Sequence, residues 1–470
     1  MAEKMTTKAA FLLAAATFLA AVLVCQSEPL GPKEVLIVLL SQGDEYHREQ
    51  KAKDFKEHLE KQAPDMDRPT VYMLHEHWPA PGAWTIFPVL NDLPGLSQKA
   101  NWVFFCEEDT RIDIHGLFDV LRKYKKTKEW FLGRALKDKE ATIIHHFAFP
   151  ENPSKFKYPS FAAGFALSMP LVKKLIKRLK DKPKVSDFSI DAQHELAMFI
   201  WQKGRGQALE DIKKFCYEAE GKDCVTTYPF KSPNCSESLI EDDVFFAVKT
   251  CEQFHKERVP FVKKTWAKDA AHIEYFSETV DKSIPTIDLG VPNTERGHCG
   301  KTLAIIKKAV NDPKISKKKW LVIADDDTLL NVQRLLQLLA CYDPENMVYL
   351  GERYGYNTAA REPSGYDYIT GGGGIVMSMT AARMLLLTGM CNCPSNDAPD
   401  DMTLGMCFKT LAVPCVHHPS FHQARPDDYS EGYLAQQIPV SFHKFWMVDP
   451  LDVYKTWLQD KKQHRPHDEL

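Results

Sequence analysis

The feature that most constrains the fold of this chain is an internal repeat. Residues 102–110 read WVFFCEEDT and residues 320–328 read WLVIADDDT, so the two segments lie 218 residues apart. Further matches follow in the same order at an offset of 210 residues, among them Gly164 with Gly374 and Asp191 with Asp401. A repeat with only two copies is typical of a duplicated domain rather than of a solenoid. The 470 residues are long enough for two such domains.

Each half of the chain is predicted to be an α/β domain. Two apolar runs of strand length in each half precede the WVFF and WLVI segments, and polar segments with helical spacing separate them. The four runs are residues 34–40, 71–74, 244–248 and 272–276. This alternation predicts a sheet of mainly parallel strands in each half. We place the boundary near Leu239, which gives domains at 28–239 and 240–466.

Three consecutive carboxylates, Asp325, Asp326 and Asp327, follow the WLVI strand of the second half. Apolar residues then recur at helical spacing from Leu329 onwards, so the acids are expected between a buried strand and a helix. Open α/β sheets bind ligands at this end of their strands. Adjacent carboxylates repel one another unless a cation neutralises them, and their oxygens suit a hard divalent ion. The alternative is a solvated acidic turn.

The first half differs at the same positions. Residues 107–109 read EED instead of DDD, and residues 161–164 read FAAG where the second half has four glycines. Longer acidic side chains change the geometry around an ion, and the loss of glycine restricts how closely a ligand approaches the backbone. The first half is therefore predicted to be a non-catalytic copy.

A run of four glycines is a candidate for ligand binding in the second half. It comprises Gly371, Gly372, Gly373 and Gly374, and a short apolar run at 375–377 follows it. Glycines let backbone amides approach a sugar or a phosphate, whereas the alternative is a flexible turn.

Four further side chains are candidates for chemistry. Asp400 and Asp401 stand at a predicted helix start, where a carboxylate acts as a cap or, in a cleft, as a general base. His422 and His443 each follow a Ser-Phe pair, and either could complete a metal shell with the three aspartates. A lone histidine is more often structural.

Both ends of the chain carry sequences that resemble targeting signals. Lys4 and Lys8 precede an apolar run at 9–25, which predicts a signal peptide at residues 1–27 with cleavage near Ser27. The run is at the short limit for a membrane span, so stable membrane insertion is not expected. The last four residues read HDEL, a signal bound by the endoplasmic reticulum retention receptor. We therefore expect a soluble protein of the endoplasmic reticulum lumen.

Cysteine usage and net charge fit that expectation. Cys216, Cys224, Cys235 and Cys251 are expected to hold a loop through disulfides, and Cys106 is expected to be a buried thiol. No Cys-x-x-Cys motif is present, which argues against a disulfide oxidoreductase. The net charge of −3 gives no electrostatic basis for binding nucleic acid.

The second-half motifs resemble those of the inverting β-1,3-glycosyltransferases related to Fringe. They are DDDT after an apolar strand, then LGE, TGGGG, NDAPDDMTLGMCF and FHQARP. The resemblance is greatest to the branch that glucosylates O-linked fucose on thrombospondin type 1 repeats, and it covers most of the chain. It implies two tandem GT-A-type domains, Mn²⁺, UDP-glucose as donor and folded O-fucosylated thrombospondin repeat proteins as partners. The first half departs from the family pattern in its acids.

The same resemblance implies roles for particular residues around the donor. Asp327 and His422 would bind the metal, with Asp325 and Asp326 close to the metal or the donor. Arg296 would help to bind the nucleotide, and the four glycines would contact the substrate. The ion would neutralise the diphosphate as UDP leaves.

Asp401 matches the position of the family's general base, with Asp400 as its near rival. The base would take the proton from the fucose 3-hydroxyl in a single in-line displacement, which inverts the anomeric centre. Two alternatives stay open. One is the same fold with UDP-N-acetylglucosamine as donor. The other is a non-enzymatic lumenal lectin or quality-control binding protein.

Overall fold

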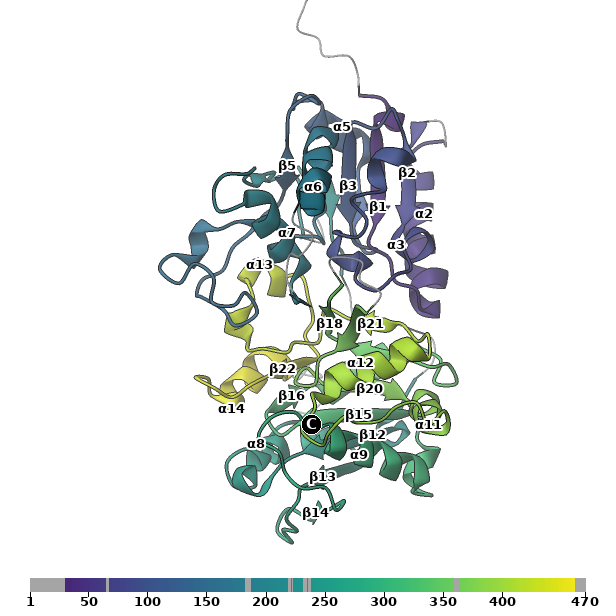
Figure 1. Cartoon of the computed structure of the whole chain (residues 1–470), viewed down its shortest axis with the longest axis vertical. Coiled ribbons are helices and arrows are strands. Elements are labelled where there is room, and N and C mark those ends of the chain that lie inside the picture. Colours follow the sequence, from purple (N-terminus) through teal and green to yellow (C-terminus); the bar gives the residue numbers. More distant parts are fainter. Residues whose placement is uncertain are drawn as a thin grey trace, which may run out of the picture.

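The computed structural model describes residues 30–460, except 65–66, 182–186, 219–220, 222, 231–234, 236–237 and 359–363. The predicted signal peptide and retention signal lie outside the described residues. Two α/β halves stack along the long axis of the molecule (Figure 1).

A six-stranded sheet forms the core of the first half, with strand order β10-β5-β8-β3-β1-β2. Strands β1, β2 and β3 run parallel, whereas β8 is antiparallel to both β3 and β5. The strands are β1 (Val35–Leu39), β2 (Thr70–Met73), β3 (Trp102–Cys106), β5 (Phe131–Gly133), β8 (Phe165–Ser168) and β10 (Glu210–Asp211).

A seven-stranded sheet forms the core of the second half, with strand order β14-β13-β12-β15-β20-β17-β21. Apart from β14, each strand has a counterpart at the same place in the first sheet, and β20 is again the antiparallel one. This shared topology supports the interpretation of the repeat as a duplication. The strands are β12 (Val244–Lys249), β13 (Ile273–Phe276), β14 (Thr286–Ile287), β15 (Trp320–Asp325), β17 (Tyr349–Gly351), β20 (Ile375–Ser378) and β21 (Cys415–His417).

The central strands are apolar apart from Lys249 and Asp325 at the ends of β12 and β15, because helices cover both faces of each sheet. In β12, Phe246 packs in one apolar cluster with α10, and Phe245 packs in another with α9. The first sheet is covered in the same way by α2 and α6. The longer helices are α2 (Ala52–Glu60), α5 (Ile114–Leu121), α6 (Met169–Asp181), α7 (Ala192–Trp201), α9 (Cys299–Asn311), α10 (Val332–Leu339), α11 (Met379–Leu387) and α12 (Asp400–Thr410). The shorter ones are α3 (Leu74–His77), α4 (Leu93–Leu96), α8 (Val259–Lys264), α13 (Glu431–Leu434) and α14 (Pro450–Val453).

Two details differ from the sequence-based expectation. The run at 375–377 forms β20 as predicted, but this strand is antiparallel to β15, so the sheet is mixed. Leu329 lies in a short strand, β16 (Thr328–Leu330), rather than in the helix after the acids. Strand β16 pairs with β22 (Ser441–His443), and that pairing shapes the site described below.

The two halves share contacts at their junction. Strand β9 (Phe188–Ser189) of the first half pairs with β18 (Arg353–Tyr356), which also pairs with β19 (Tyr366–Ile369). Helix α13, near the carboxyl end, lies beside α7 of the first half (Figure 1), and its Gly432 packs against Leu136 and Tyr217. Other short strands at the edges are β4 (Arg111–Ile112), β6 (Ala135–Leu136), β7 (Tyr158–Pro159) and β11 (Thr226–Thr227).

Four disulfides join described cysteines: Cys216–Cys224, Cys235–Cys341, Cys299–Cys393 and Cys391–Cys407. Cys106 is a buried thiol as predicted, but Cys251 is also a buried free thiol rather than part of the expected loop staple. Among the described residues, no helix has the length and apolarity to span a membrane.

Candidate active site

Two aspartates and a histidine converge at the carboxyl end of β15. The ligand atoms of Asp325, Asp327 and His443 all lie within 4.8 Å of one another. The His443 Nε2 atom is 3.0 Å from an Asp327 oxygen and 3.8 Å from an Asp325 oxygen. The pairing of β16 with β22 sets Thr328 opposite His443, which brings the ring to the acids. Two carboxylates and an imidazole are donors that suit Mn²⁺, so this set fits the predicted ion.

His422 does not belong to this group, in contrast to the role that the family resemblance implies. Its Nε2 lies 2.7 Å from Gln437 Oε1, and its Nδ1 lies 2.8 Å from the Ser441 carbonyl. The ring is fully buried and stacks on Phe442. Burial lowers the pKa of His422 to about 4, so the ring is neutral. Of the two histidines left open by the sequence, the structure places His443 beside the acids.

Asp326 is not part of this cluster and has other partners. Thr250 donates to one of its oxygens at 2.7 Å, and Arg258 approaches the other at 3.1 Å. Arg258 also lies 3.0 Å from Asp327, while its guanidinium stacks over the Phe254 ring. Arg258 therefore pairs with two of the three acids, and no sequence pattern had singled it out.

Lys249 links the metal-binding candidates to the helix start at Asp400. It ends β12, where it pairs in register with Asp325, and its Nζ lies 3.0 Å from Asp325 and 2.6 Å from Asp400. Burial alone would raise the pKa of Asp325, but Lys249 and His443 outweigh it and hold that pKa at about 2. Sequence reasoning missed Lys249, although a single charge ending an apolar strand is a usable signal.

Asp400 and Asp401, at the start of α12, have different surroundings. Asp400 is buried and accepts hydrogen bonds from Lys249 and from Thr302, both at 2.6 Å, and Lys249 lowers its pKa against the effect of burial. Among the described residues, no cationic partner of Asp401 is that close. Burial, followed by the charge of Asp400, raises the pKa of Asp401 to about 7. Asp400 is therefore held as a permanent carboxylate, whereas Asp401 exchanges a proton near neutral pH.

The glycine run packs directly against these residues. A side chain at Gly372 would meet the His443 ring at 2.3 Å, and Gly374 adopts a positive φ of 95°, so both positions favour glycine. The amides of Gly372 and Gly373 donate to Gln423 Oε1 at 2.9 and 3.2 Å. The glycines thus let the His443 ring approach the acids.

Arg296, predicted to help bind the nucleotide, is exposed on the loop before α9. The neighbouring Gly297 packs against the carbonyls of Asp397 and Ala398, just before α12. Arg296 therefore lies on a loop that packs beside the segment leading to Asp400.

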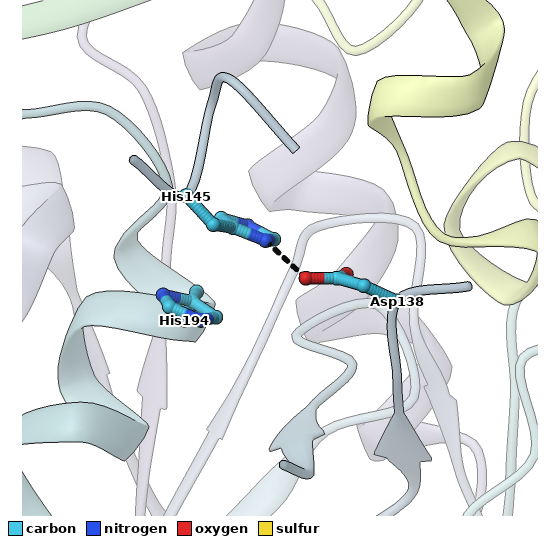
Figure 2. A group of neighbouring side chains, drawn as sticks. All are labelled: Asp138, His145 and His194. Carbon is cyan, nitrogen blue, oxygen red and sulfur yellow. Dashed lines mark hydrogen bonds and ion pairs between the residues drawn. The ribbon is translucent and has the colours of Figure 1, made fainter. Parts of the chain in front are cut away.

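A second group of possible ligands lies in the first half and comprises Asp138, His145 and His194 (Figure 2). His145 uses both ring nitrogens, on Asp138 at 2.6 Å and on Asp191 at 2.9 Å. Burial would lower the pKa of His145, but these two carboxylates raise it to about 9. The rings of His145 and His194 stack at 3.8 Å, so one ion cannot lie in the plane of both. His145 therefore forms a buried ion triad with Asp138 and Asp191, which argues against a metal site in this group.

Comparisons with known proteins agree with the geometry. The sequence model of the Fringe-like family matches residues 91–196 and 239–464, and the chain belongs to this family. A β-1,3-glucosyltransferase of Mus musculus is 53% identical over 434 residues, covering 92% of this chain and 88% of the relative. Its Homo sapiens counterpart is 51% identical over 440 residues, covering 93% and 87%. The Fringe glycosyltransferase of Drosophila melanogaster is 32% identical over 257 residues, covering 49% and 62%.

The chain is an enzyme, a glycosyltransferase that forms β-1,3 linkages. The predicted family resemblance and the α/β, GT-A-type fold class are confirmed.

Proposed function

We propose that this enzyme transfers glucose from UDP-glucose, in β-1,3 linkage, to O-linked fucose on folded thrombospondin type 1 repeats. The observation that carries the proposal is identity above one half, over about nine tenths of the chain, to proteins named β-1,3-glucosyltransferases. The cluster of Asp325, Asp327 and His443 supports a divalent ion at the donor site. The nature of the acceptor rests on the motif resemblance. Four disulfides support an oxidising compartment such as the endoplasmic reticulum lumen.

The side chains of the second half have separate parts in this reaction. Asp325, Asp327 and His443 would hold Mn²⁺, which supplies positive charge against the diphosphate of the departing UDP. Asp401 accepts the proton of the attacking fucose hydroxyl, because its pKa of about 7 suits a general base at neutral pH. Lys249 keeps Asp400 ionised and fixes the first turn of α12. Arg258 bridges Asp326 and Asp327 and so positions both carboxylates.

The experiment is a donor panel on a defined acceptor. The full chain is incubated with an O-fucosylated thrombospondin repeat, Mn²⁺ and either UDP-glucose or UDP-N-acetylglucosamine, and the product mass is measured. A hexose increment with UDP-glucose supports the proposal. An N-acetylhexosamine increment instead would identify UDP-N-acetylglucosamine as the donor, the first of the two alternatives. Absence of any transfer, together with absence of metal-dependent UDP release, would favour the lectin or quality-control alternative.

A further inference from the structure

A cavity of about 180 Å³ lies between the two halves, separate from the acids of the second half. It is lined by residues that follow β1 and β3 of the first sheet and β17 and β21 of the second sheet. Carboxyl ends of parallel strands therefore meet at this cavity from both sides, which is the usual position of a ligand in α/β sheets. Its lining includes Gln42, Glu107, Tyr228, Glu352, Arg353 and Gln436.

The cavity occupies the place in the first half that the candidate metal site has in the second, but each of its acids already has a partner in the chain. The Lys51 ammonium lies 2.7 and 2.8 Å from the two oxygens of Asp109, the counterpart of Asp327. In β11, Thr227 pairs with Arg111, which places Tyr228 opposite Thr110 and thus in the position of His443. The Tyr228 hydroxyl donates to Glu107 at 3.0 Å. These contacts leave no open set of ligands for a metal and its diphosphate.

The remaining groups around the cavity are of mixed kind, with the carboxyls of Asp191 and Glu352, the guanidinium of Arg353 and several side-chain amides. The amide side chains of Gln193 and Gln436 line the cavity. The side-chain oxygen of each already accepts a hydrogen bond from another residue of the chain. Arg353 contributes a buried Nε that has no hydrogen-bond partner among the described residues. Its guanidinium lies over the ring of Trp84, at 4.8 Å from the ring centre. Hydrogen-bonding groups beside aromatic rings are the usual lining of a pocket for a small organic molecule.

We propose that this cavity binds an uncharged sugar, without a divalent cation. A sugar ring offers hydroxyls that both donate and accept, which matches the mixture of amide, carboxyl and hydroxyl groups in the wall. Its apolar face matches the rings of Trp84 and Tyr228. A phosphate is disfavoured because the nearby cation Lys51 is already paired with Asp109. The inference does not depend on which sugar the second half transfers.

The test uses the full chain carrying Asp401→Asn, so that turnover does not interfere. Glucose, methyl α-fucoside and N-acetylglucosamine are titrated in EDTA and followed by saturation-transfer NMR. We expect saturable binding of at least one of them. Tyr228→Phe should weaken it about 5- to 10-fold through loss of one hydrogen bond, and Ala162→Leu should abolish it by filling the cavity. The matched control is Tyr124→Phe, whose ring packs on Trp130 and does not line the cavity.

Three results would overturn the inference. The first is absence of saturable binding by all three sugars. The second is equal affinity in Tyr228→Phe and in the parent. The third is competition by free UDP, which would place the sugar in the second half. If Ala162→Leu fails to melt cooperatively, Tyr228→Phe and Gln436→Ala decide instead. Because no donor is present, failure of this inference is distinguishable from failure of the proposed transfer reaction.

Discussion

The carboxyl ends of β3 and β15 have the same backbone arrangement but different side chains around their acids. Thr110 accepts a hydrogen bond from the Glu107 amide at 3.1 Å and donates to the Ala162 carbonyl at 2.9 Å. Thr328 makes the two equivalent bonds, with the Asp325 amide and the Gly372 carbonyl, at the same distances. The scaffold that presents the acids is therefore common to both halves.

The difference lies in what balances the negative charge. In the first half, an ammonium that belongs to the chain itself, that of Lys51, is paired with Asp109. In the second half, Lys249 and Arg258 also approach Asp325 and Asp327, each at 3.0 Å, but His443 joins these two acids to form a set of three possible ligands. Three possible ligand atoms within 4.8 Å of one another can take an exchangeable ion, and such an ion keeps coordination positions for a substrate. The comparison teaches that the backbone arrangement of the site is kept in both halves although the side chains around the acids differ.

The largest expected effect that tests this comparison is that of Asp327→Ala. Losing a residue that only contacts a metal ligand lowers activity by up to about 100-fold. Removing a carboxylate that binds the ion itself should therefore lower transfer by more than about 100-fold. The measurement is sugar transfer at saturating Mn²⁺, with the melting temperature as a check on folding. Asp343→Ala, a change at an exposed turn acid, is the matched control. Substantial transfer by a folded Asp327→Ala protein would remove this residue from the metal site.

Asp401→Asn should have the next largest effect. Asparagine keeps the shape of the side chain but cannot accept a proton, so turnover should fall by about 10²- to 10⁴-fold. Melting temperature and binding of UDP with Mn²⁺ should stay near those of the wild type. Asp400→Asn should reduce turnover less and stability more, because it removes the partner of the buried Lys249 ammonium. The reverse order of the two turnover losses would identify Asp400 as the base.

His443→Ala and His422→Gln separate the two histidines. Loss of His443 should raise the Mn²⁺ concentration for half-maximal activity by at least about 10- to 100-fold. His422→Gln should leave that concentration unchanged and lower the melting temperature, because its ring is buried between Gln437, Ser441 and Phe442. If the Mn²⁺ concentration for half-maximal activity rises in His422→Gln but not in His443→Ala, His422 binds the metal as the family resemblance implies.

The pH profile of transfer should report Asp401. Its pKa is raised from the ordinary aspartate value to about 7, so the carboxyl is protonated and inactive below that pH. We expect kcat/KM to fall about tenfold for each pH unit below 7. The same shift makes the folded state hold a proton that the unfolded state releases, so this group's contribution to stability falls as pH rises through 7. Residual activity of Asp401→Asn should lack this acidic limb; its retention would assign the limb to another group.

Much of this arrangement was predictable from local sequence, and the rest depended on pairing over long distances. The apolar runs, the acids after β15 and the helix start at Asp400 are local patterns, and each formed as expected. The position of His443 depends on the pairing of β22 with β16, more than 100 residues earlier in the chain, and residue spacing carries no information on that register. Lys249 and Arg258 were missed for the same reason, since each contacts an acid that lies far from it in the sequence.

The smallest expected effect concerns the first half, in the triple variant Glu107→Ala, Glu108→Ala and Asp109→Ala. Donor hydrolysis should be unchanged, because Lys51 and Tyr228, not a metal, are the partners of these acids. The melting temperature should fall, since Lys51 loses Asp109 and His47 loses Glu108. Any catalytic defect should appear as a higher KM for the folded protein acceptor.

If the alanine variant does not fold, the isosteric changes to Gln, Gln and Asn replace it. Loss of UDP-sugar hydrolysis with normal melting would mean that both halves hold nucleotide and that the two strand ends are functionally alike.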